Sequence, residues 1–576
     1  MSINNKKKQI IASCISIDSI TNDDISDLLI SPPSQDLGDF ALPCFRFAKI
    51  LKKSPLAIAE DLAQSISEAN KNKFASIIAV NGYLNFKFNP LESAKQILAE
   101  ILEKKSGFGS STIGAGKTIC IDYSSINIAK PLHIGHLSST IIGSALYKVY
   151  KKLGYNAVGI NHLGDWGTQF GKLIVAFDLW GNMAALKKEQ IPYLSKIYVK
   201  FHEEAQNQPE LNDQARAAFK KLEDGDLHAI ELYSVFKKIT LQDVAKIYKI
   251  LHVHFDSLNG EAFFNDKMTP VIDELNNLKL TEISDDALVV RLSDYDMPPC
   301  ILIRSDGATL YATRDLAAAY YRKEKYDFHK CLYVVAYQQN LHFKQIFKVL
   351  ELAGKKWAKD MVHVPFGMVS LEDGAMSTRK GNVILLKDVI DKSIEKSLVI
   401  LKSKSPKLKN KRSLATKIGV GAVVFFALSN NRIKDIIFSY DKILSFDGET
   451  APYVQYTNVR ALSVLKNMNV DLNKYFTNHL TDDELKGLDN KESALLVSLF
   501  EKFPDILSDV LDKYEPSILT RYIIDVAKAF NKFYLENRIL NAPDEFKRSR
   551  AALTYATHII ICEGLKLLGI DTPEEM

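Results

Sequence analysis

The sequence has little of what marks several protein classes. Its six cysteines are widely spaced, with no Cys-x-x-Cys pair and no Cys/His cluster at zinc-ligand spacing, so a disulfide scaffold is excluded and no zinc module is predicted. Only 27 glycines and 18 prolines occur among 576 residues, which excludes a low-complexity chain. The longest apolar run, residues 418–428, is too short to span a bilayer. The cysteine usage predicts a reduced, cytoplasmic protein.

The sequence also lacks a strong excess of positive or negative charge. The chain has 74 Lys and Arg against 69 Asp and Glu, and the formal net charge of +5 neither demands nor forbids a nucleic-acid partner. What the sequence does contain is ordinary globular composition, with 47% hydrophobic and 25% charged residues. Its basic N-terminus is followed by a short apolar patch that Ser13, Ser16 and Asp18 interrupt. This predicts an amphipathic first helix and not a signal peptide.

Three domains are expected from the local patterns. Residues 1–107 predict a small α+β domain, in which Ser54 and Pro55 begin a helix and residues 75–80 and 82–88 form strands. Residues 108–400 predict an α/β domain with a long helical insertion. Residues 401–576 predict an all-α helical bundle, because strand signals vanish from about residue 415.

The α/β domain opens with a strand, a turn, a helix and a second strand, which is half of a nucleotide-binding parallel-sheet unit. Its predicted strands are 118–123, 156–161, 287–292, 300–304 and 332–336, and its predicted helices are 135–153 and 341–352, with the insertion at about 171–255.

The first chemical motif, Asn-Ile-Ala-Lys-Pro-Leu-His-Ile-Gly-His at residues 127–136, follows a strand and opens a helix. His133 and His136 are three apart, so both can face one ligand at the helix N-terminus, where the dipole favours an anion. Gly135 allows a flat ring such as adenine to lie against the backbone. A bare His-x-x-His pair is more often a helix cap or half of a metal site. The preceding strand and Lys130 favour a nucleotide site.

The second motif, Met-Ser-Thr-Arg-Lys-Gly-Asn at residues 376–382, is a short polar segment with adjacent cations. Such a loop can close over a triphosphate and stabilise a departing pyrophosphate. Alone it would more often be a solvated basic turn, but the histidine motif upstream favours the catalytic interpretation.

Together these motifs resemble the two signatures of class I aminoacyl-tRNA synthetases. The chain resembles the arginyl-tRNA synthetase family in particular, through residues 124–130, 161–171, 311–315, 451–456 and 568–576. The resemblance implies an α/β fold: a Rossmann-type parallel-sheet catalytic domain with a small α+β N-terminal domain and an all-α C-terminal bundle. It also implies ATP-dependent formation of arginyl-adenylate and transfer of arginine to the 3′-terminal adenosine of its tRNA. The expected partners are tRNA(Arg), L-arginine, ATP and Mg²⁺, with no protein metal site, no membrane and a monomeric state.

The sequence departs from the family pattern at four positions. Ile126 stands where the family usually has proline, and Ser138 where it often has arginine. Ala375 and Thr378 replace usual lysines of the second signature. By resemblance, Lys130 supplies a compensating charge just before the histidine motif.

The resemblance also assigns residues to roles. The residues implied in catalysis are Lys130, His133, His136, Arg379 and Lys380. Those implied in ATP binding are His133, Gly135, His136, Met376 and Ser377. Those implied in arginine binding are Asn127, His162, Glu261, Tyr311, Asp315 and Gln339. Those implied in tRNA binding are Tyr83 and Asn85 at the D-loop and Tyr453, Tyr456 and Met576 at the anticodon loop.

The chemistry of arginine supports part of this assignment, because a guanidinium group needs carboxylates, ideally in bidentate geometry. Tyr311 and Asp315 are four apart and share one side of a helix. For Asp315 the structural alternative is a carboxylate at a helix start, and for Glu261 an ordinary surface residue. For Tyr83 the alternative is an amphipathic strand in a small core.

Two other functions fit part of the pattern. A small nucleotidylyltransferase also uses a histidine motif at a helix N-terminus, but it needs no helical bundle at residues 415–576. A synthetase-like RNA-binding protein without activity is the second alternative. Lys130, the histidine pair and Asp315 argue against it, whereas Ser138 and Ala375 leave it open. ATP–pyrophosphate exchange with arginine, with and without tRNA, separates the three.

Overall fold

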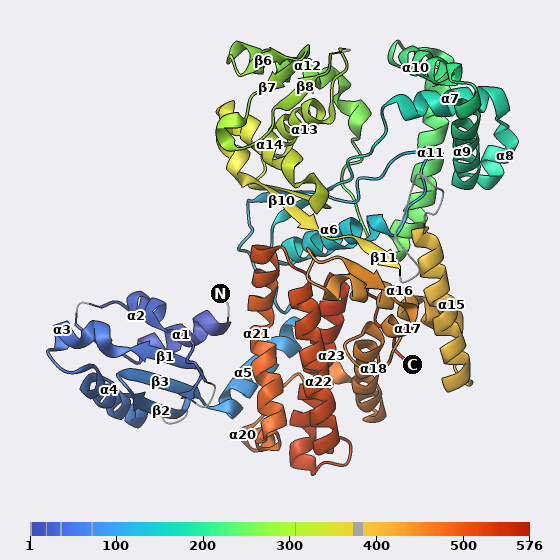
Figure 1. Cartoon of the computed structure of the whole chain (residues 1–576). Helices are drawn as coiled ribbons and strands as arrows, with labels where there is room; N and C mark the ends of the chain where they lie inside the picture. The colour runs from blue at the N-terminus through green and yellow to red at the C-terminus, as the bar shows by residue number, and fades with distance from the viewer. Residues whose placement is uncertain (1–2, 19, 35–36, 71–72, 306, 372–383) are drawn as a thin grey trace.

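A computed structural model describes residues 3–18, 20–34, 37–70, 73–305, 307–371 and 384–576. Figure 1 shows the N-terminal domain at lower left, the catalytic domain and its helical insertion above, and the C-terminal helices below. The predicted class, a parallel-sheet catalytic domain between an α+β domain and a helical domain, is confirmed.

The N-terminal domain is a three-stranded antiparallel sheet covered by helices. Its strand order is β1 (Phe40–Pro43), β3 (Tyr83–Phe88) and β2 (Phe74–Val80), with helices α1 (Ile3–Ser13), α2 (Asn22–Leu28) and α4 (Pro55–Ala69). The predicted helix start is confirmed, because Ser54 Oγ accepts the Ala57 N–H at 3.2 Å. The buried core of this domain ends at Phe88.

Helix α5 (Pro90–Lys104) joins a different core. Its buried residues Ala94, Ile97 and Leu98 pack with α21 (Lys491–Lys513) and α23 (Asp544–Leu567) of the C-terminal region. The sequence shows that one face of α5 is apolar but not which partner covers it. The structure places α5 in the core shared by the catalytic and C-terminal helices, and the domain boundary at residue 107 stays a prediction. The N-terminal domain is also joined to α21 by a partly buried ion pair, Lys7 Nζ to Glu501 Oε2 at 2.7 Å.

The catalytic sheet is parallel, in the order β10 (Met361–Phe366), β9 (Lys330–Ala336), β4 (Thr118–Asp122) and β5 (Asn156–Ile160). Side chains alternate between two cores. Ile119 and Ile121 face the core that contains α6 (Gly135–Lys152), whereas Cys120 faces the core that contains α13 (Tyr311–Tyr326) and α14 (Asn340–Leu352). Helices therefore cover both faces, as a parallel sheet requires.

Two insertions flank this sheet. The predicted helical insertion is confirmed and runs from α7 (Thr168–Trp180) through α8 (Met183–Glu189), α9 (Ile191–Asn207) and α10 (Glu210–Glu223) to α11 (Leu227–Ile250). The predicted strands near residues 287 and 300 form a separate antiparallel sheet of β6 (Thr281–Ser284), β7 (Ala287–Val290) and β8 (Cys300–Ile303).

The C-terminal region is mainly helical, as predicted. Its long helices are α15 (Leu386–Lys404), α16 (Lys411–Ser429), α18 (Ala451–Asn467), α21, α22 (Ser517–Glu536) and α23. The prediction that strands vanish after residue 415 is wrong at one place, because β12 (Ile436–Phe438) pairs in parallel with β11 (Val369–Leu371). Three residues are too few to give an alternating pattern, so only the pairing defines this strand.

Helix α16 is long and apolar enough to cross a membrane by length and composition alone. Most of its residues are buried against α15, α18 and α22. We assign it as the core helix of the bundle, because a helix that is apolar all round suits a buried position.

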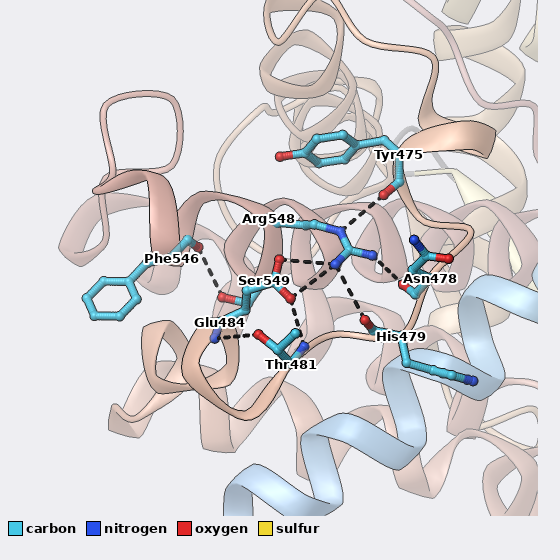
Figure 2. A network of polar contacts seen from close by, with 8 residues as sticks. All are labelled: Tyr475, Asn478, His479, Thr481, Glu484, Phe546, Arg548 and Ser549. Atoms are coloured by element: carbon cyan, nitrogen blue, oxygen red, sulfur yellow. Dashed lines mark hydrogen bonds and ion pairs between the residues drawn. The ribbon is translucent and has the colours of Figure 1, made fainter.

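Arg548 of α23 binds residues 475–484, the segment that precedes α21, to the helical bundle (Figure 2). Its guanidinium donates to three backbone carbonyls between residues 475 and 479, with Nε to Tyr475 O at 3.1 Å. Its Nη1 also lies 3.0 Å from both carboxylate oxygens of Glu484. Glu484 in turn closes a capping box with Thr481 at the start of α20 (Asp482–Leu485).

We expect Arg548→Ala to loosen this segment locally, because several partly buried acceptors lose their donor together. Amide hydrogen exchange across residues 475–485 should accelerate about tenfold or more, with little change in the catalytic sheet. Lys566→Ala removes an exposed cation from the same helix and is the matched control. Equal exchange in both variants would show that the network contributes nothing to local stability.

Candidate active site

The two histidines of the first motif cap the start of α6. The His133 N–H donates to His136 Nδ1 at 3.2 Å, and the Gly135 N–H donates to His133 Nδ1 at 3.1 Å. Their ring centroids are 3.9 Å apart. Because each Nδ1 accepts a hydrogen bond, each neutral ring carries its proton on Nε2. The capping geometry and a ligand-facing Nε2–H are therefore compatible.

Burial keeps this pair uncharged. It lowers the pKa of His136 to about 3, with a smaller contribution from His133. Burial and then the Lys130 charge lower the pKa of His133. In the protein without ATP the two rings are therefore neutral at pH 7 and can donate hydrogen bonds to a phosphate. The permanent positive charge at this edge comes from other residues.

Lys130 is one of those residues. Its side chain reaches solvent, with Nζ 6.0 Å from the centre of the Tyr198 ring on α9, and partial burial lowers its pKa. Met376, Ser377, Arg379 and Lys380 lie outside the described residues.

Residues 384–386, which follow the second motif, are joined to the histidine motif by backbone hydrogen bonds. The Ile134 N–H donates to Ile384 O at 3.0 Å, and the Leu386 N–H donates to Leu132 O at 2.9 Å. The segment that follows the second motif is therefore bonded directly to the first motif.

The loop between β4 and α6 is strained. Ser124, Ser125 and Ala129 have φ of 71°, 46° and 61°, in the left-handed region that non-glycine residues rarely adopt. The insertion helix α11 holds this conformation, since Tyr248 OH lies 2.7 Å from Ser124 Oγ and Thr240 Oγ1 accepts the Ala129 N–H at 3.0 Å. Such strain costs about 1–3 kcal/mol per residue and is typical of ligand-binding loops.

Asp315 lies on α13 and is held by a histidine. His342 Nε2 on α14 is 2.6 Å from Asp315 Oδ2. Burial raises the pKa of Asp315, but the His342 hydrogen bond and the charges of nearby basic groups outweigh it, so its pKa lies below the ordinary value. Asp315 is thus an ionised, partly buried carboxylate. Tyr311, one turn before it, is 67% exposed.

Glu261 has the opposite electrostatic character. Burial raises its pKa to about 7, although Arg314 Nη1 lies 3.9 Å from its Oε2 and opposes the shift. The loop that carries it is fixed by Asp165, which is fully buried and whose Oδ1 accepts the Ala262 N–H at 2.9 Å. Asp165 Oδ2 accepts from Lys237 Nζ at 2.6 Å, so the same carboxylate joins this loop to the insertion.

His162 follows β5 and lies in the field of several aspartates. Burial lowers its pKa, while the charges of Asp122, Asp315 and Asp165 oppose the change. Its ring lies 5.5 Å from the Phe264 ring, and its buried Nδ1 has no hydrogen-bond partner among the described residues. A buried polar atom without a partner is a candidate ligand contact.

The remaining arginine-site residues lie at the same edge of the sheet. Asn127 follows β4 and is exposed, and its Oδ1 lies so close to Gly164 that a Cβ there would be only 2.4 Å away. Gln339 is exposed and ends the short helix η6 (Tyr337–Gln339) directly after β9. The loops after β4, β5 and β9 therefore carry the described residues predicted for arginine and ATP, apart from Glu261, Tyr311 and Asp315, which neighbouring elements supply.

The predicted D-loop residues lie in the N-terminal sheet. The Tyr83 ring packs edge-on against Phe45, 5.3 Å between centroids. Asn85 is only 4% exposed and donates to Ile78 O at 3.4 Å. Both residues belong to the central strand, so the structure leaves the tRNA role of Tyr83 and Asn85 as a prediction.

The predicted anticodon residues lie in the helical domain. Tyr453 OH accepts from Asn531 Nδ2 at 3.0 Å, and Tyr456 is half exposed. The Arg460 guanidinium lies between Tyr456 and Tyr534, 5.1 and 5.2 Å from the two rings. Met576 packs against the helical core. Sites of this kind, aromatic rings beside a guanidinium, suit stacking of unpaired bases.

Sequence reasoning missed several residues of the site. They are Asp122 and Arg322, a buried ion pair at 2.6 Å beneath it, together with Asp165 and His342. Asp165 stands inside the motif at residues 161–171, and an aspartate that ends an apolar strand was a visible signal at Asp122. His342 gave no signal, because only the packing of α14 against α13 brings it to Asp315. Arg460 of the helical domain was also missed, although it stands four residues after Tyr456 on the same helix, where such a spacing predicts contact.

A parallel sheet with a paired-histidine motif at the start of the helix after its first strand, joined to a helical C-terminal domain, is the arrangement expected of a class I aminoacyl-tRNA synthetase. Family models agree over most of the chain: "tRNA synthetases class I (R), catalytic domain" matches residues 97–440, "DALR anticodon binding domain" matches residues 454–576, and "Arginyl tRNA synthetase N terminal domain" matches residues 4–88. The chain belongs to the arginyl-tRNA synthetase family.

Relatives and solved structures agree with this family. An arginine–tRNA ligase of Alkaliphilus metalliredigens is 48% identical and covers 97% of each chain, and one of Clostridium beijerinckii is 50% identical and covers 96% of each chain. The fold is similar to the Thermus thermophilus arginyl-tRNA synthetase, with a TM-score of 0.76, 23% identity and coverage of 95% and 96% of the two chains. The Plasmodium falciparum enzyme gives a TM-score of 0.76, 24% identity and coverage of 100% and 98%.

Proposed function

We propose that this arginine–tRNA ligase activates arginine at the carboxyl edge of its parallel sheet, with the phosphates of ATP at the start of α6 and the guanidinium near Asp315. One observation carries the proposal. The neutral histidine pair and Lys130 lie on the loop after β4, and an ionised carboxylate is held near the same sheet edge by His342. These groups match a polyphosphate and a guanidinium respectively.

The chemistry proceeds in two steps. A carboxylate oxygen of arginine attacks the α-phosphorus of ATP, the bond from that phosphorus to the bridging oxygen breaks, and pyrophosphate leaves. The 2′-hydroxyl of the terminal adenosine then attacks the carbonyl carbon of arginyl-adenylate, loses its proton, and AMP leaves. Phosphoryl-type transfer needs positioning and charge stabilisation more than covalent catalysis. His133 and His136 donate hydrogen bonds, and Lys130 with Arg379 and Lys380 supplies charge to the departing pyrophosphate.

The arginine substrate is held by complementary groups. Asp315 and Glu261 bind the guanidinium and Tyr311 shapes the pocket, while Asn127, His162 and Gln339 bind the polar groups of the amino acid. tRNA(Arg) contacts Tyr83 and Asn85 at one end of the molecule and Tyr453, Tyr456 and Met576 at the other. Among the described residues no group of three or more His, Cys, Asp and Glu could hold a metal ion, so we propose that Mg²⁺ arrives with ATP. We further propose a cytoplasmic monomer.

ATP–pyrophosphate exchange with arginine tests the function. We expect exchange with arginine only when the cognate tRNA is present, because tRNA binding completes the site by induced fit. Omitting arginine, or replacing it by lysine, is the control, since a point charge cannot reproduce the planar fork. Full exchange in RNA-free enzyme would contradict the tRNA requirement. No exchange under any condition would indicate an inactive relative.

Arginine affinity is expected to fall as the pH falls below 7. The guanidinium needs an ionised Glu261, and burial raises the pKa of that carboxyl to about 7, so protonation removes one anionic partner. Between pH 8 and pH 6 the arginine dissociation constant should rise about tenfold. Equilibrium binding with tRNA and a non-hydrolysable ATP analogue measures it.

Glu261→Gln supplies the control for this pH dependence. The variant should bind arginine weakly at every pH, and its arginine dissociation constant should no longer change near pH 7. A change of equal size in the variant would assign the titration to another group.

A further inference from the structure

The corner between α21 and α22, at residues 514–516, forms a largely buried ion pair with the catalytic domain, between Glu515 and Arg432. Glu515 Oε2 accepts the Arg432 backbone N–H at 3.2 Å and faces Arg432 Nη1 at 3.4 Å, and these side chains are 8% and 15% exposed. Next to Glu515, Tyr514 OH accepts from Lys330 Nζ at 3.2 Å, where β9 begins. This corner lies within the segment that matches the anticodon-binding model, so it links that domain to the catalytic sheet.

Arg432 and the residues after it are in turn hydrogen-bonded to the segment that begins β11. Its carbonyl accepts the Gly367 N–H at 2.7 Å, and the nearby Asp435 Oδ1 accepts the Met368 N–H at 2.6 Å. The turn at residues 431–435 then continues into β12, which pairs residue by residue with β11. A Cβ at Gly367 would lie 2.4 Å from the Lys434 carbonyl carbon, so only glycine permits this approach. The turn therefore fixes where β11 lies.

The position of β11 matters because of what adjoins it in sequence. β11 is the last described element before residues 372–383, the part of the sequence that carries the second motif, and residues 384–386 beyond it are bonded to the histidine motif. A shift of about 1 Å in a group that positions a reacting centre can cost about a hundredfold in rate. A residue that sets β11 can therefore act on catalysis from a distance.

The Glu515–Arg432 pair leaves some of its own hydrogen-bonding atoms without partners, which is unusual for a contact whose only role is stability. Glu515 Oε1 and Arg432 Nε have no hydrogen-bond partner among the described residues, and the charged contact at 3.4 Å is longer than a tight pair of this type. A buried pair left incomplete contributes little to stability. The pair therefore has unused hydrogen-bonding capacity where the helical domain meets the turn that holds β11.

We propose that Glu515 is a positioning residue for arginine activation: through Arg432 it sets β11, and it thereby couples tRNA binding on the helical domain to formation of arginyl-adenylate. The proposal rests on the function proposed above. It assigns to Glu515 no contact with arginine, ATP or tRNA.

Glu515→Gln tests the coupling, because the amide oxygen can still accept the Arg432 N–H while the charge is lost. We expect single-turnover adenylate formation, at saturating ATP, arginine and tRNA, to slow at least about tenfold. The tRNA dissociation constant and the arginine KM should change less than about twofold. Asp509→Asn, on α21 just before the corner, removes a carboxylate that pairs with exposed Lys513, and it should leave all three values unchanged.

Several outcomes would overturn the proposal. Unchanged adenylate formation in Glu515→Gln would do so, as would a matching loss of tRNA affinity or a loss accounted for by the unfolded fraction in a thermal melt. If that variant does not fold, Arg432→Lys keeps the charge and the backbone contact but not the planar fork, and the same selective loss of rate is expected. Wild-type enzyme without arginine-dependent exchange would instead refute the proposed function.

Discussion

Replacing Lys130 with alanine is expected to slow arginyl-adenylate formation about a hundredfold or more, with little loss of tRNA affinity. The histidine pair is neutral in the protein without ATP, and Ala375 and Thr378 stand where the second signature of the resembling family usually has lysine. Arg379, Lys380 and Lys130 remain to supply charge to the leaving pyrophosphate. A cation used mainly as charge develops contributes to kcat more than to KM.

Single-turnover adenylate formation in saturating ATP, arginine and tRNA measures this effect, beside a tRNA-binding titration. Lys172→Ala is the matched control, because Lys172 also lies over an aromatic ring of α9, 5.9 Å from the centre of Phe201, and burial likewise lowers its pKa. An unchanged chemical step together with weaker tRNA binding in Lys130→Ala would make Lys130 a nucleic-acid contact.

The second large effect is expected from Asp315→Asn, which should weaken arginine binding by about 2–4 kcal/mol. The asparagine carbonyl can still accept from His342, so the side chain keeps its orientation. What the variant loses is the negative charge that pairs with the guanidinium. The effect should therefore appear in the arginine dissociation constant and in kcat/KM, with normal tRNA affinity and an unchanged thermal melt.

Asp327→Asn provides the comparison, because Asp327 is an exposed carboxylate that follows the same helix and reaches Lys323. It should behave as wild type. Arginine binding in Asp315→Asn equal to that of Asp327→Asn would show that Asp315 only orders the start of α13.

The regular elements could be predicted because each has a local cause. Ser54 and Pro55 begin α4, and the apolar runs of β4, β5 and β9 have the pattern of a sheet covered on both faces. Contacts that depend on packing gave no such signal. His342 reaches Asp315 only because α13 and α14 lie together, and β12 exists only where β11 lies beside it.

The candidate site shows the same division. The histidine motif located the sheet edge. The family resemblance gave Asp315 its predicted role, and the spacing to Tyr311 showed only that the two residues share one side of a helix. The charge state of each group could not be read from sequence, because it depends on burial: Glu261 and Asp315 are both carboxyls, yet their pKa values shift in opposite directions.

The placement of α5 has a consequence for how the chain is made. Its apolar stripe and the neighbouring Phe108, which stacks on Phe503 at 5.9 Å, find their partners about 400 residues later in the chain. A ribosome that adds about 5–20 residues per second needs roughly 20–80 s to reach them. During that interval the residues of the N-terminal core have all been synthesised and can pack together. The residues of α5 have been synthesised too, but the helices that cover their apolar face have not. The nascent chain therefore passes through a stage in which the apolar side chains of residues 90–104 have no partner to cover them.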